Sequence, residues 1–341
     1  MQAFIVNAPK QSSVSEVSDP TASDGQVVVK ISRAGVCGTD YEFFDGSMSY
    51  LHSGEAKYPI RLGHEWCGEV ISVADSSLNH WLGKRVIGDT MLGCQKCYRC
   101  LSGRQHLCET RFEIGIRNGW EGALAEQLLV PAFALHELPD SIDDEIGALV
   151  EPAGNAFRAA LAAGAQAGKE ILIFGTGTIG LLTAQFAMAQ GASVHMVGTS
   201  ESTISLARQL GVTNASTEVP DIANGFDAVI DATDHEVIPA KALDVVEYGG
   251  RVVYIGLSRT ASLIDSRKLA LKDVTAVGIL SASPGLKGAI EALATGSVNP
   301  RPLIGAVVGL HELNSVLSGV RPANATSGPK IQVDPRIKGQ L

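Results

Sequence analysis

The sequence predicts an α/β protein with two domains, one rich in β-strands and one built on a doubly wound parallel sheet. Its 341 residues suit two domains of ordinary size. Short apolar or alternating runs fill residues 1–150, whereas continuous apolar runs alternate with helical patterns from about residue 155. The last strand-like run lies beyond this alternation, so we expect the tail of the chain to complete the first domain.

The first domain is predicted from strand-like runs that are separated by Gly, Pro and Asp residues. Their number and short length indicate a barrel-like or folded-over sheet. The runs lie at residues 26–36, 67–73, 84–88, 122–131 and 133–138, and the tail adds residues 328–335.

The second domain is predicted from strands that are apolar throughout, which is typical of a parallel sheet covered by helices on both faces. The expected strands lie at residues 169–175, 193–198, 227–233, 251–256 and 274–280. The expected helices lie at residues 178–191, 202–211, 237–250 and 285–296.

The composition narrows the class of protein. Hydrophobic residues make up 45% and charged residues 18%, as in a folded domain. The net charge of −9 and a pI near 5.4 argue against a nucleic-acid partner, which would require a basic face. The first residues lack a secretory signal, and no apolar run of about 18 residues appears. We therefore expect a cytoplasmic protein without a membrane span.

Four of the six cysteines fall within residues 94–108. Clustered cysteines in a reducing compartment are more often metal ligands or redox groups than disulfides. The spacing C-x2-C-x2-C-x7-C supplies four thiolates, enough to close a tetrahedral zinc shell. Paired disulfides or a redox CxxC are the alternatives, and both leave two cysteines unexplained. The predicted ligands of this structural zinc are Cys94, Cys97, Cys100 and Cys108.

A glycine motif, FGTGTIG, lies between a predicted strand and a predicted helix. Gly175 permits a tight turn, Gly177 lets the backbone approach a pyrophosphate, and Gly180 allows close packing of helix and strand. Thr178 and Ile179 open the helix, whose N-terminus would face the phosphates. We interpret the motif as a dinucleotide site; the alternative is a tight strand-to-helix turn without a ligand.

The end of the next strand indicates which nicotinamide cofactor is bound. An acidic residue there would hydrogen-bond the ribose 2′-hydroxyl of NAD, but this chain has Gly198. Without a carboxylate, a 2′-phosphate is not repelled, and Thr199 and Ser200 can donate hydrogen bonds to it. Glu201 lies close by and no arginine follows directly. These residues favour NADP over NAD.

A second metal site is predicted from two separated motifs, GVCGTDYE and GHEWCGEV. Cys37 and His64 are typical zinc ligands, and Glu65 adds a carboxylate. Glu151 is a further candidate, because it lies where the chain passes between the domains. Taken singly, a buried thiol or a satisfied core histidine is the simpler interpretation of these residues.

The order of these motifs resembles the zinc-dependent medium-chain alcohol dehydrogenase superfamily. The resemblance covers essentially the whole chain and is closest to the polyol, sugar and threonine dehydrogenase branch. It implies a GroES-like catalytic domain (residues 1–154 and 291–341) with an inserted Rossmann domain (residues 155–290), and a homodimer or homotetramer. It further implies that the catalytic zinc is held by Cys37 and His64, with Glu65 and Glu151 binding directly, through water or alternately. The cysteine cluster at about residues 94–108 matches the structural-zinc lobe.

The resemblance also assigns roles in the reaction. Zinc would act as a Lewis acid on an alcohol or carbonyl oxygen while a hydride passes to or from the nicotinamide. Thr39 matches the hydroxyl that bonds the substrate oxygen. Glu42 replaces a histidine that completes the proton relay in much of the family. A glutamate at this position resembles the pattern of the glucose dehydrogenase branch, so we expect a sugar or polyol substrate.

Three alternatives remain. A threonine-dehydrogenase-like oxidation of an amino alcohol is one, although that relative usually has the relay histidine. A non-catalytic NAD(P)H sensor on the same scaffold is another, and a zinc-ribbon nucleic-acid binder is the third. For the other candidate side chains, we expect Cys67 to be a buried core thiol and His106 to be solvent-exposed. His52 lies in a segment expected near the substrate mouth, where a histidine is more often solvated than catalytic, and Asp40 is expected to anchor the turn after Cys37.

Overall fold

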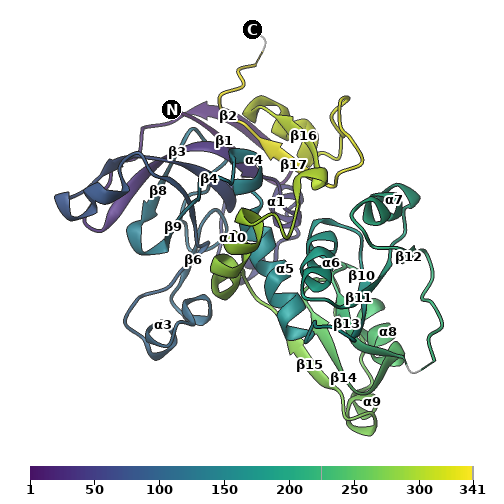
Figure 1. The fold of residues 1–341 in the computed structure, drawn as a ribbon. Coiled ribbons are helices and arrows are strands. Elements are labelled where there is room, and N and C mark those ends of the chain that lie inside the picture. Colours follow the sequence, from purple (N-terminus) through teal and green to yellow (C-terminus); the bar gives the residue numbers. More distant parts are fainter. Residues whose placement is uncertain (224, 340–341) are drawn as a thin grey trace. The chain divides into compact units, whose positions relative to one another are not determined.

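The computed structural model describes residues 1–223 and 225–339, which form two compact units (Figure 1). The first unit contains Met1–Glu151, Ile304–Thr326 and the chain from Lys330 onward. The second contains Pro152–Leu303 and Ser327–Pro329. The main divisions therefore lie at 151/152 and 303/304, where the sequence predicted 154/155 and 290/291.

A seven-stranded mixed sheet organises the first unit, with the order β16-β17-β3-β4-β5-β9 and with β8 paired to β3. β16 and β17 run parallel, and the other pairs are antiparallel. The strands are β3 (Gln26–Gly35), β4 (Glu65–Val73), β5 (Arg85–Gly88), β8 (Gln127–Pro131), β9 (Leu135–Glu137), β16 (Ile304–Val308) and β17 (Lys330–Val333). A hairpin of β1 (Gln2–Ala8) and β2 (Gln11–Glu16) and a short pair of β6 (Met91–Leu92) and β7 (Phe112–Glu113) complete the strands of this unit.

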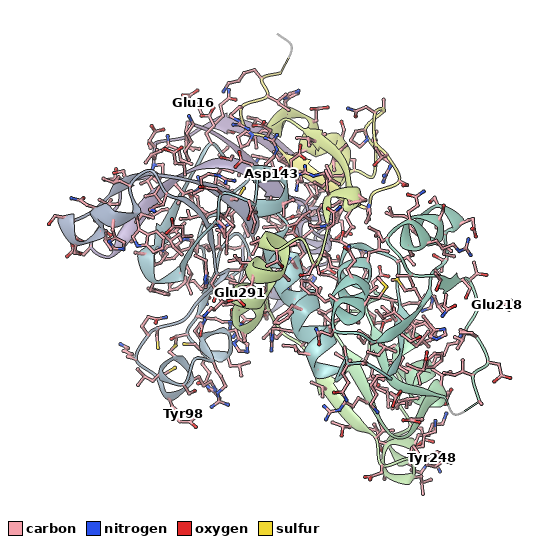
Figure 2. All side chains as sticks on the ribbon, viewed as in Figure 1. Glu16, Tyr98, Asp143, Glu218, Tyr248 and Glu291 are labelled. Atoms are coloured by element: carbon pink, nitrogen blue, oxygen red, sulfur yellow. The ribbon has the colours of Figure 1, made fainter. Side chains whose placement is uncertain are left out.

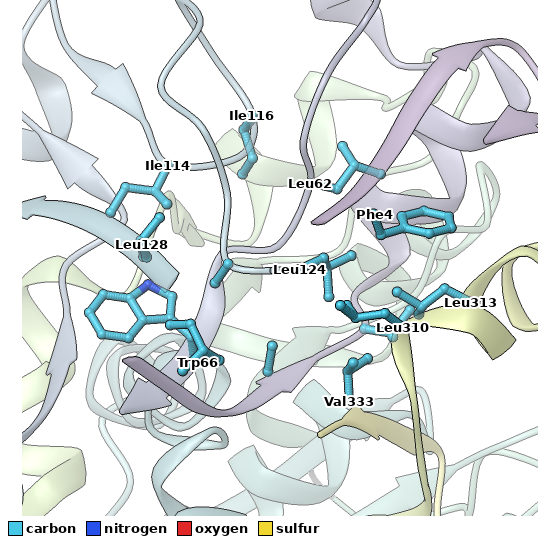
Figure 3. Packing of buried hydrophobic residues seen from close by; sticks show 14 of the residues in the cluster. Phe4, Leu62, Trp66, Ile114, Ile116, Leu124, Leu128, Leu310, Leu313 and Val333 are labelled. Carbon is cyan, nitrogen blue, oxygen red and sulfur yellow. The ribbon is translucent and has the colours of Figure 1, made fainter. Parts of the chain in front are cut away.

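The core of the first unit draws on both ends of the chain. Phe4 and Leu62, which come from the N-terminal part, are at most 1% exposed. Leu313 and Val333, which come from the C-terminal part, are fully buried in the same cluster (Figure 3). The tail strand β17 is thus held by apolar packing as well as by its hydrogen bonds to β3.

Six parallel strands form the sheet of the second unit, in the order β12-β11-β10-β13-β14-β15. Taken by their order in the chain, this is the 3-2-1-4-5-6 arrangement of a dinucleotide-binding fold. The α/β class and the parallel sheet predicted from the sequence are confirmed. The strands are β10 (Glu170–Phe174), β11 (Ser193–Val197), β12 (Asn214–Ser216), β13 (Phe226–Asp231), β14 (Val246–Tyr254) and β15 (Thr275–Gly278).

The helices are short in the first unit and longer in the second. Those of the first unit are α1 (Gly38–Asp45), α2 (Ser49–Ser53), α3 (Tyr98–Leu101), α4 (Asp144–Gly147) and α11 (Leu313–Leu317). α5 (Val150–Ala162) carries the chain into the second unit, which has α6 (Thr178–Ala189), α7 (Glu201–Gln209), α8 (Ile238–Val245), α9 (Ser266–Leu271) and α10 (Leu286–Ala294). Within the described residues, none of the helices has the length and apolar character that a membrane crossing requires.

One predicted helix is wrong at its end. The helix expected at residues 237–250 stops with α8 at Val245, and β14 begins at the next residue. Val246 pairs with Phe226, but pairing resumes only at Arg251, so residues 247–250 bulge opposite Asp227. Gly249 has a φ of 75°, which is compatible with a bulge and not with a helix.

Candidate functional site

Four cysteines come together in a lobe whose base is closed by the pairing of β6 with β7. The Sγ atoms of Cys94, Cys97, Cys100 and Cys108 all lie within 4.8 Å of one another. All are unpaired thiols, and Figure 2 shows sulfur atoms gathered in the lobe that carries Tyr98. The structure therefore brings together all four predicted ligands in a cluster with the size and donors of a closed zinc site.

The thiols of this lobe do not ionise independently. Burial raises the pKa of Cys108, but hydrogen bonds from the Cys94 backbone and Thr110 lower it to about 6. Burial raises the pKa of Cys100 to about 12. Neighbouring thiolates repel one another, so all four ionise together only when a cation lies among them. The donor set fits a zinc ion.

His106 lies inside this lobe rather than on its surface. The expectation that it is exposed is wrong, because only 4% of the residue is accessible. The single turn Gln105–Leu107, which contains His106, packs against β6. His52, by contrast, is exposed as predicted, and Cys67 is a buried thiol that donates to the Asp144 carbonyl at 3.1 Å.

A second cluster forms where β3 leads into α1. Cys37 is the residue that caps the N-terminus of α1. Asp40 Oδ2 accepts the backbone N–H of Cys37 at 2.8 Å, so Asp40 anchors this turn as the sequence predicted. Cys37, His64 and Glu65 place one ligand atom each within 4.8 Å of the others.

His64 is buried beside several negative groups. Its Nδ1 lies 3.9 Å from Asp40 Oδ1, and neither atom has a hydrogen-bond partner among the described residues. Burial lowers the pKa of His64, but the neighbouring Cys37 thiolate, with Asp40 and Glu151, raises that pKa well above its usual range. Burial also raises the pKa of Asp40. A buried imidazole in such surroundings suits a cation, either a proton or a metal ion.

Glu65 is paired with a lysine that the sequence analysis missed. Lys330, the first residue of β17, is 3% exposed, and its Nζ donates to Oε1 and Oε2 of Glu65 at 2.8 and 2.7 Å. Burial lowers the pKa of this ammonium, but Glu65 raises it, and the net shift is upward. The available signal was a lysine at the start of the short tail strand, directly before Ile331.

Gly35 makes room for the Glu65 carboxylate. The two residues are paired between β3 and β4, and a Cβ built on Gly35 would lie 2.0 Å from Glu65 Oε2. Real Cβ contacts are never that short, so any larger residue at this position would have to displace the Glu65 carboxylate. One thiol, one imidazole and one carboxylate in a buried cradle fit a zinc ion.

Glu151 lies in the first turn of α5 and is half-buried. Its carboxylate is close enough to raise the pKa of His64. Among the described residues around His64, the group whose ligand atoms all lie within 4.8 Å of one another consists of Cys37, His64 and Glu65, without Glu151. Direct binding of a metal by Glu151 therefore stays a prediction.

The three glycines of the dinucleotide loop each meet the requirement predicted for them. Gly175 has a φ of 105°, which permits the turn after β10. A Cβ on Gly180 would lie 1.9 Å from the Gly175 carbonyl oxygen, so helix and strand could not pack. A Cβ on Gly177 would meet nothing within 4 Å, which leaves the backbone open to a ligand. The N–H groups of Thr178 and Ile179 at the start of α6 have no partner within the helix.

Comparisons with known proteins agree with this geometry. Residues 23–140 match the alcohol dehydrogenase GroES-like domain, and residues 178–295 match the zinc-binding dehydrogenase domain. L-threonine 3-dehydrogenase of Cronobacter sakazakii is 30% identical over 78% of this chain and 80% of its own length. The chain belongs to the zinc-dependent medium-chain alcohol dehydrogenase family.

Solved structures resemble this dehydrogenase over nearly its whole length. A zinc-binding dehydrogenase from Sinorhizobium meliloti bound to NADP has a TM-score of 0.88 and 27% identity, covering 98% of this chain and 99% of that one. L-idonate 5-dehydrogenase from Escherichia coli has a TM-score of 0.85 and 24% identity, covering 98% and 97%. At 24% identity, the similarity to L-idonate 5-dehydrogenase shows a shared fold and nothing more.

Thr39 and Glu42 of this dehydrogenase are three residues apart on α1, so they lie on one face of the helix. Both are half-buried. The Thr39 hydroxyl has no hydrogen-bond partner in the described residues. This hydroxyl follows Cys37 by two residues, in the first turn of α1.

Thr176 fills the space that a side chain at position 198 would occupy, and this chain has Gly198 there. A Cβ at this position would lie 2.4 Å from Thr176 Oγ1, so an acidic residue could not be placed there without moving Thr176. Thr199 and Ser200, which follow, are exposed. Glu201 forms an ion pair with Arg208, whose Nη1 lies 2.9 Å from Glu201 Oε1. The sequence analysis missed this arginine, although a spacing of seven residues places both side chains on one face of α7.

A cavity of about 180 Å³ lies at the carboxyl ends of β13 and β14 in the dehydrogenase. Asp231, Thr233, His235 and Tyr254 contribute to its lining. Asp231 Oδ1 accepts the Thr233 hydroxyl at 2.7 Å, and burial raises the pKa of Asp231. The sequence analysis named none of these residues. The ends of parallel strands are where ligands bind in such sheets, and this rule could have indicated them.

Proposed function

We propose that this protein oxidises a sugar or polyol, or reduces the corresponding carbonyl compound, with NADP as the favoured cofactor. The observation that carries the proposal is the cluster of Cys37, His64 and Glu65, two residues before the unengaged hydroxyl of Thr39 in the first turn of α1. A zinc ion bound at that cluster supplies Lewis acidity to an alcohol or carbonyl oxygen.

Residues of this chain would transfer the proton and hold the cofactor. Thr39 accepts the proton of the substrate hydroxyl through a hydrogen bond and passes its own proton on. Glu42, on the same face of α1, receives that proton or accepts a hydrogen bond from a second hydroxyl of the substrate. The glycine loop and the N-terminus of α6 hold the pyrophosphate of the cofactor.

The substrate class rests on Glu42. A carboxylate near the reacting carbon favours a molecule with several hydroxyl groups, because each can donate a hydrogen bond to it. The motif CGTDYE agrees with this choice. Oxidation of an amino alcohol is the second candidate, and the 30% identity to L-threonine 3-dehydrogenase favours it.

The preference for NADP rests on the end of β11. Thr176 prevents a carboxylate at Gly198, and Arg208 partly neutralises Glu201. The exposed hydroxyls of Thr199 and Ser200 can donate to a 2′-phosphate. The similarity to a dehydrogenase bound to NADP supports the same cofactor.

We further propose two zinc ions per chain, a cytoplasmic location and a homodimer or homotetramer. Two clusters with zinc-type donors support the count, and six unpaired cysteines fit a reducing compartment. β15 is an exposed edge strand, and Leu271, at the end of the helix that precedes it, is 78% exposed. A second copy would cover this edge. Analytical ultracentrifugation tests this, and a monomer at micromolar concentration contradicts it.

A substrate panel tests the function. Sugars, polyols, simple alcohols and threonine are compared with NADP and with NAD, and kcat/KM is measured for each. The proposal expects one sugar or polyol to lead, with NADP preferred. If threonine alone is turned over, the result contradicts the proposal and supports the second candidate, oxidation of an amino alcohol. For the relay, Glu42→Gln should lower kcat/KM or move its pH profile; no change in either would exclude the proton-transfer role of Glu42.

A further inference from the structure

The guanidinium group of Arg117 is held by two residues of the segment that contains α2. It pairs with the carboxylate of Glu55, and its Cζ lies 5.5 Å from the centre of the Tyr50 ring. The arginine side chain is 12% exposed, and Tyr50 is half-buried. An arginine over an aromatic ring at this distance is attracted by the negative face of the ring, and the attraction is stronger where water is excluded.

Two nitrogen atoms of this guanidinium depend on the ring. Nε and Nη1 of Arg117 are buried and have no hydrogen-bond partner among the described residues. Glu113 Oε1 lies 3.9 Å from Nη1, beyond hydrogen-bond distance, and already accepts the Nε–H of Arg111 at 2.8 Å. The Tyr50 hydroxyl lies 3.5 Å from the same oxygen. Tyr50, Glu55, Glu113 and Arg117 therefore form one cluster, which we call the arginine clasp.

The turn that carries Arg117 packs against the residue before His64. A Cβ on Gly115 would lie 2.8 and 2.9 Å from the O and N atoms of Gly63, so the backbones of these two glycines are in close contact. The Gly63 carbonyl also accepts the N–H of Ala123 at 2.8 Å. The arginine clasp is thus built on the backbone that leads into a predicted zinc ligand.

The segment held by the arginine clasp begins at the helix that carries Thr39 and Glu42. The Met48 N–H donates to the Glu42 carbonyl at 3.1 Å, one residue before α2 begins. After α2, the Glu55 carbonyl accepts the N–H of Asn118 at 2.8 Å. α2 therefore connects the end of α1 with the turn of residues 113–120, and the arginine clasp adds side-chain contacts to this connection.

We propose that Arg117 is a positioning residue for substrate binding, which holds α2 in place and with it the end of α1 that carries Glu42. A substrate with several hydroxyl groups then meets a preformed site and does not have to order this segment when it binds. A lysine in place of Arg117 would keep the charge for Glu55 but has no planar group to lie over the ring. This inference rests on the proposed function, because it requires a substrate beside Thr39 and Glu42.

Arg117→Met tests the inference by hydrogen exchange and by kinetics. It leaves no buried carboxylate unpaired, because Glu113 keeps Arg111 and the Glu55 side chain is 33% exposed. Exchange at the amides of residues 51 and 56 should become about tenfold faster. The KM for the best substrate of the panel should rise about tenfold, while kcat and the Kd for NADPH stay within about twofold of the wild type.

Three results would overturn the inference. The first is wild-type exchange in Arg117→Met, because α2 is then held by other contacts. The second is a wild-type KM, because the order of α2 then has no bearing on substrate binding. The third is a loss of kcat as large as the rise in KM, because the first unit is then disturbed as a whole.

Two tyrosine variants keep the test decisive if Arg117→Met does not fold. Tyr50→Phe retains the face of the ring and should behave as the wild type, whereas Tyr50→Leu removes the ring and should raise both the KM and the exchange rate. Identical behaviour of the two variants would overturn the inference. Arg104→Met is the matched control, since Arg104 lies 5.3 Å from the centre of the Tyr98 ring in the cysteine lobe. It should leave the KM and the exchange of residues 51 and 56 unchanged.

The proposed function fails separately from the inference. If the wild-type protein turns over none of the alcohols or carbonyl compounds of the panel, both fall. If the wild type is active and Arg117→Met and Tyr50→Leu match it in KM and in exchange, the inference alone is wrong.

Discussion

Lys330 Nζ lies 2.7 Å from Oε2 of Glu65, although 265 residues separate the two in the chain. The bond joins the first residue of the tail strand to the first residue of β4, next to the predicted zinc ligands. The tail strand β17, which pairs with β3, therefore supplies a side chain that contacts a member of the metal cluster.

Gly35→Ala tests the space behind Glu65. The added Cβ would lie 2.0 Å from Oε2, so the carboxylate must move and its bonds to Lys330 must lengthen. We expect a loss of about 1–3 kcal/mol in unfolding free energy, measured by urea denaturation, together with reduced zinc retention. Gly38→Ala is the control, because a Cβ there meets nothing within 4 Å. Equal stability of the two variants would contradict the packing described for Gly35.

The glycines of the nucleotide loop should separate by function. Gly177→Ala adds a methyl group in open space, so the thermal midpoint should stay near that of the wild type. The Kd for NADPH should rise by about tenfold or more, because the backbone can no longer approach the pyrophosphate. Gly180→Ala should lower the thermal midpoint as well, since its Cβ meets the Gly175 carbonyl. Unchanged NADPH affinity in Gly177→Ala would remove this residue from the cofactor site.

The cofactor preference should change only when two residues change. Gly198→Asp alone forces the new side chain against Thr176, so binding of both cofactors should weaken. Gly198→Asp/Thr176→Ala removes most of that clash and should favour NAD, because the carboxylate accepts a bond from the ribose and repels the 2′-phosphate. The ratio of kcat/KM for NADP and NAD measures the effect. A wild-type ratio well below one would contradict the NADP preference itself.

Tyr254 should make stability depend on pH in the alkaline range. Burial raises its pKa to about 12, and its hydroxyl donates to the Pro239 carbonyl at 3.1 Å. Because the folded protein binds this proton more tightly than the unfolded chain, the contribution of Tyr254 is complete below pH 10 and is lost as the pH rises towards 12. The advantage of the wild type over Tyr254→Phe in urea denaturation should therefore shrink between pH 8 and pH 11. A constant difference would contradict the raised pKa.

The sequence predicted those features that depend on local pattern. The apolar strands of the parallel sheet, the glycine loop and both sets of zinc-type donors are short motifs with a physical reason for their spacing, and the structure places each of them as described. The four cysteines lie close together in the sequence, so the folding of a single lobe brings their thiols together. Gly177 and Gly180 could be assigned separate roles because each has its own steric requirement.

What could not be predicted depends on pairing between distant segments. Nothing near Lys330 in the sequence points to Glu65, and Gly35 is one glycine among 37 until β3 and β4 are in register. The bulge at residues 247–250 breaks the helical pattern only because β14 must return to pair with β13. His106 is buried by the packing of its turn on β6, which no local pattern indicates.

The most direct test of two zinc sites with different roles is the zinc content per chain of the wild type, Cys37→Ser and Cys94→Ser, with NADP-linked turnover measured on the same samples. We expect about two zinc ions in the wild type and about one in each variant. Cys37→Ser should lose turnover while keeping its fold, and Cys94→Ser should lose stability first. Full zinc content and turnover in Cys37→Ser, or one zinc ion in the wild type, would contradict the assignment of the Cys37 cluster as the catalytic site.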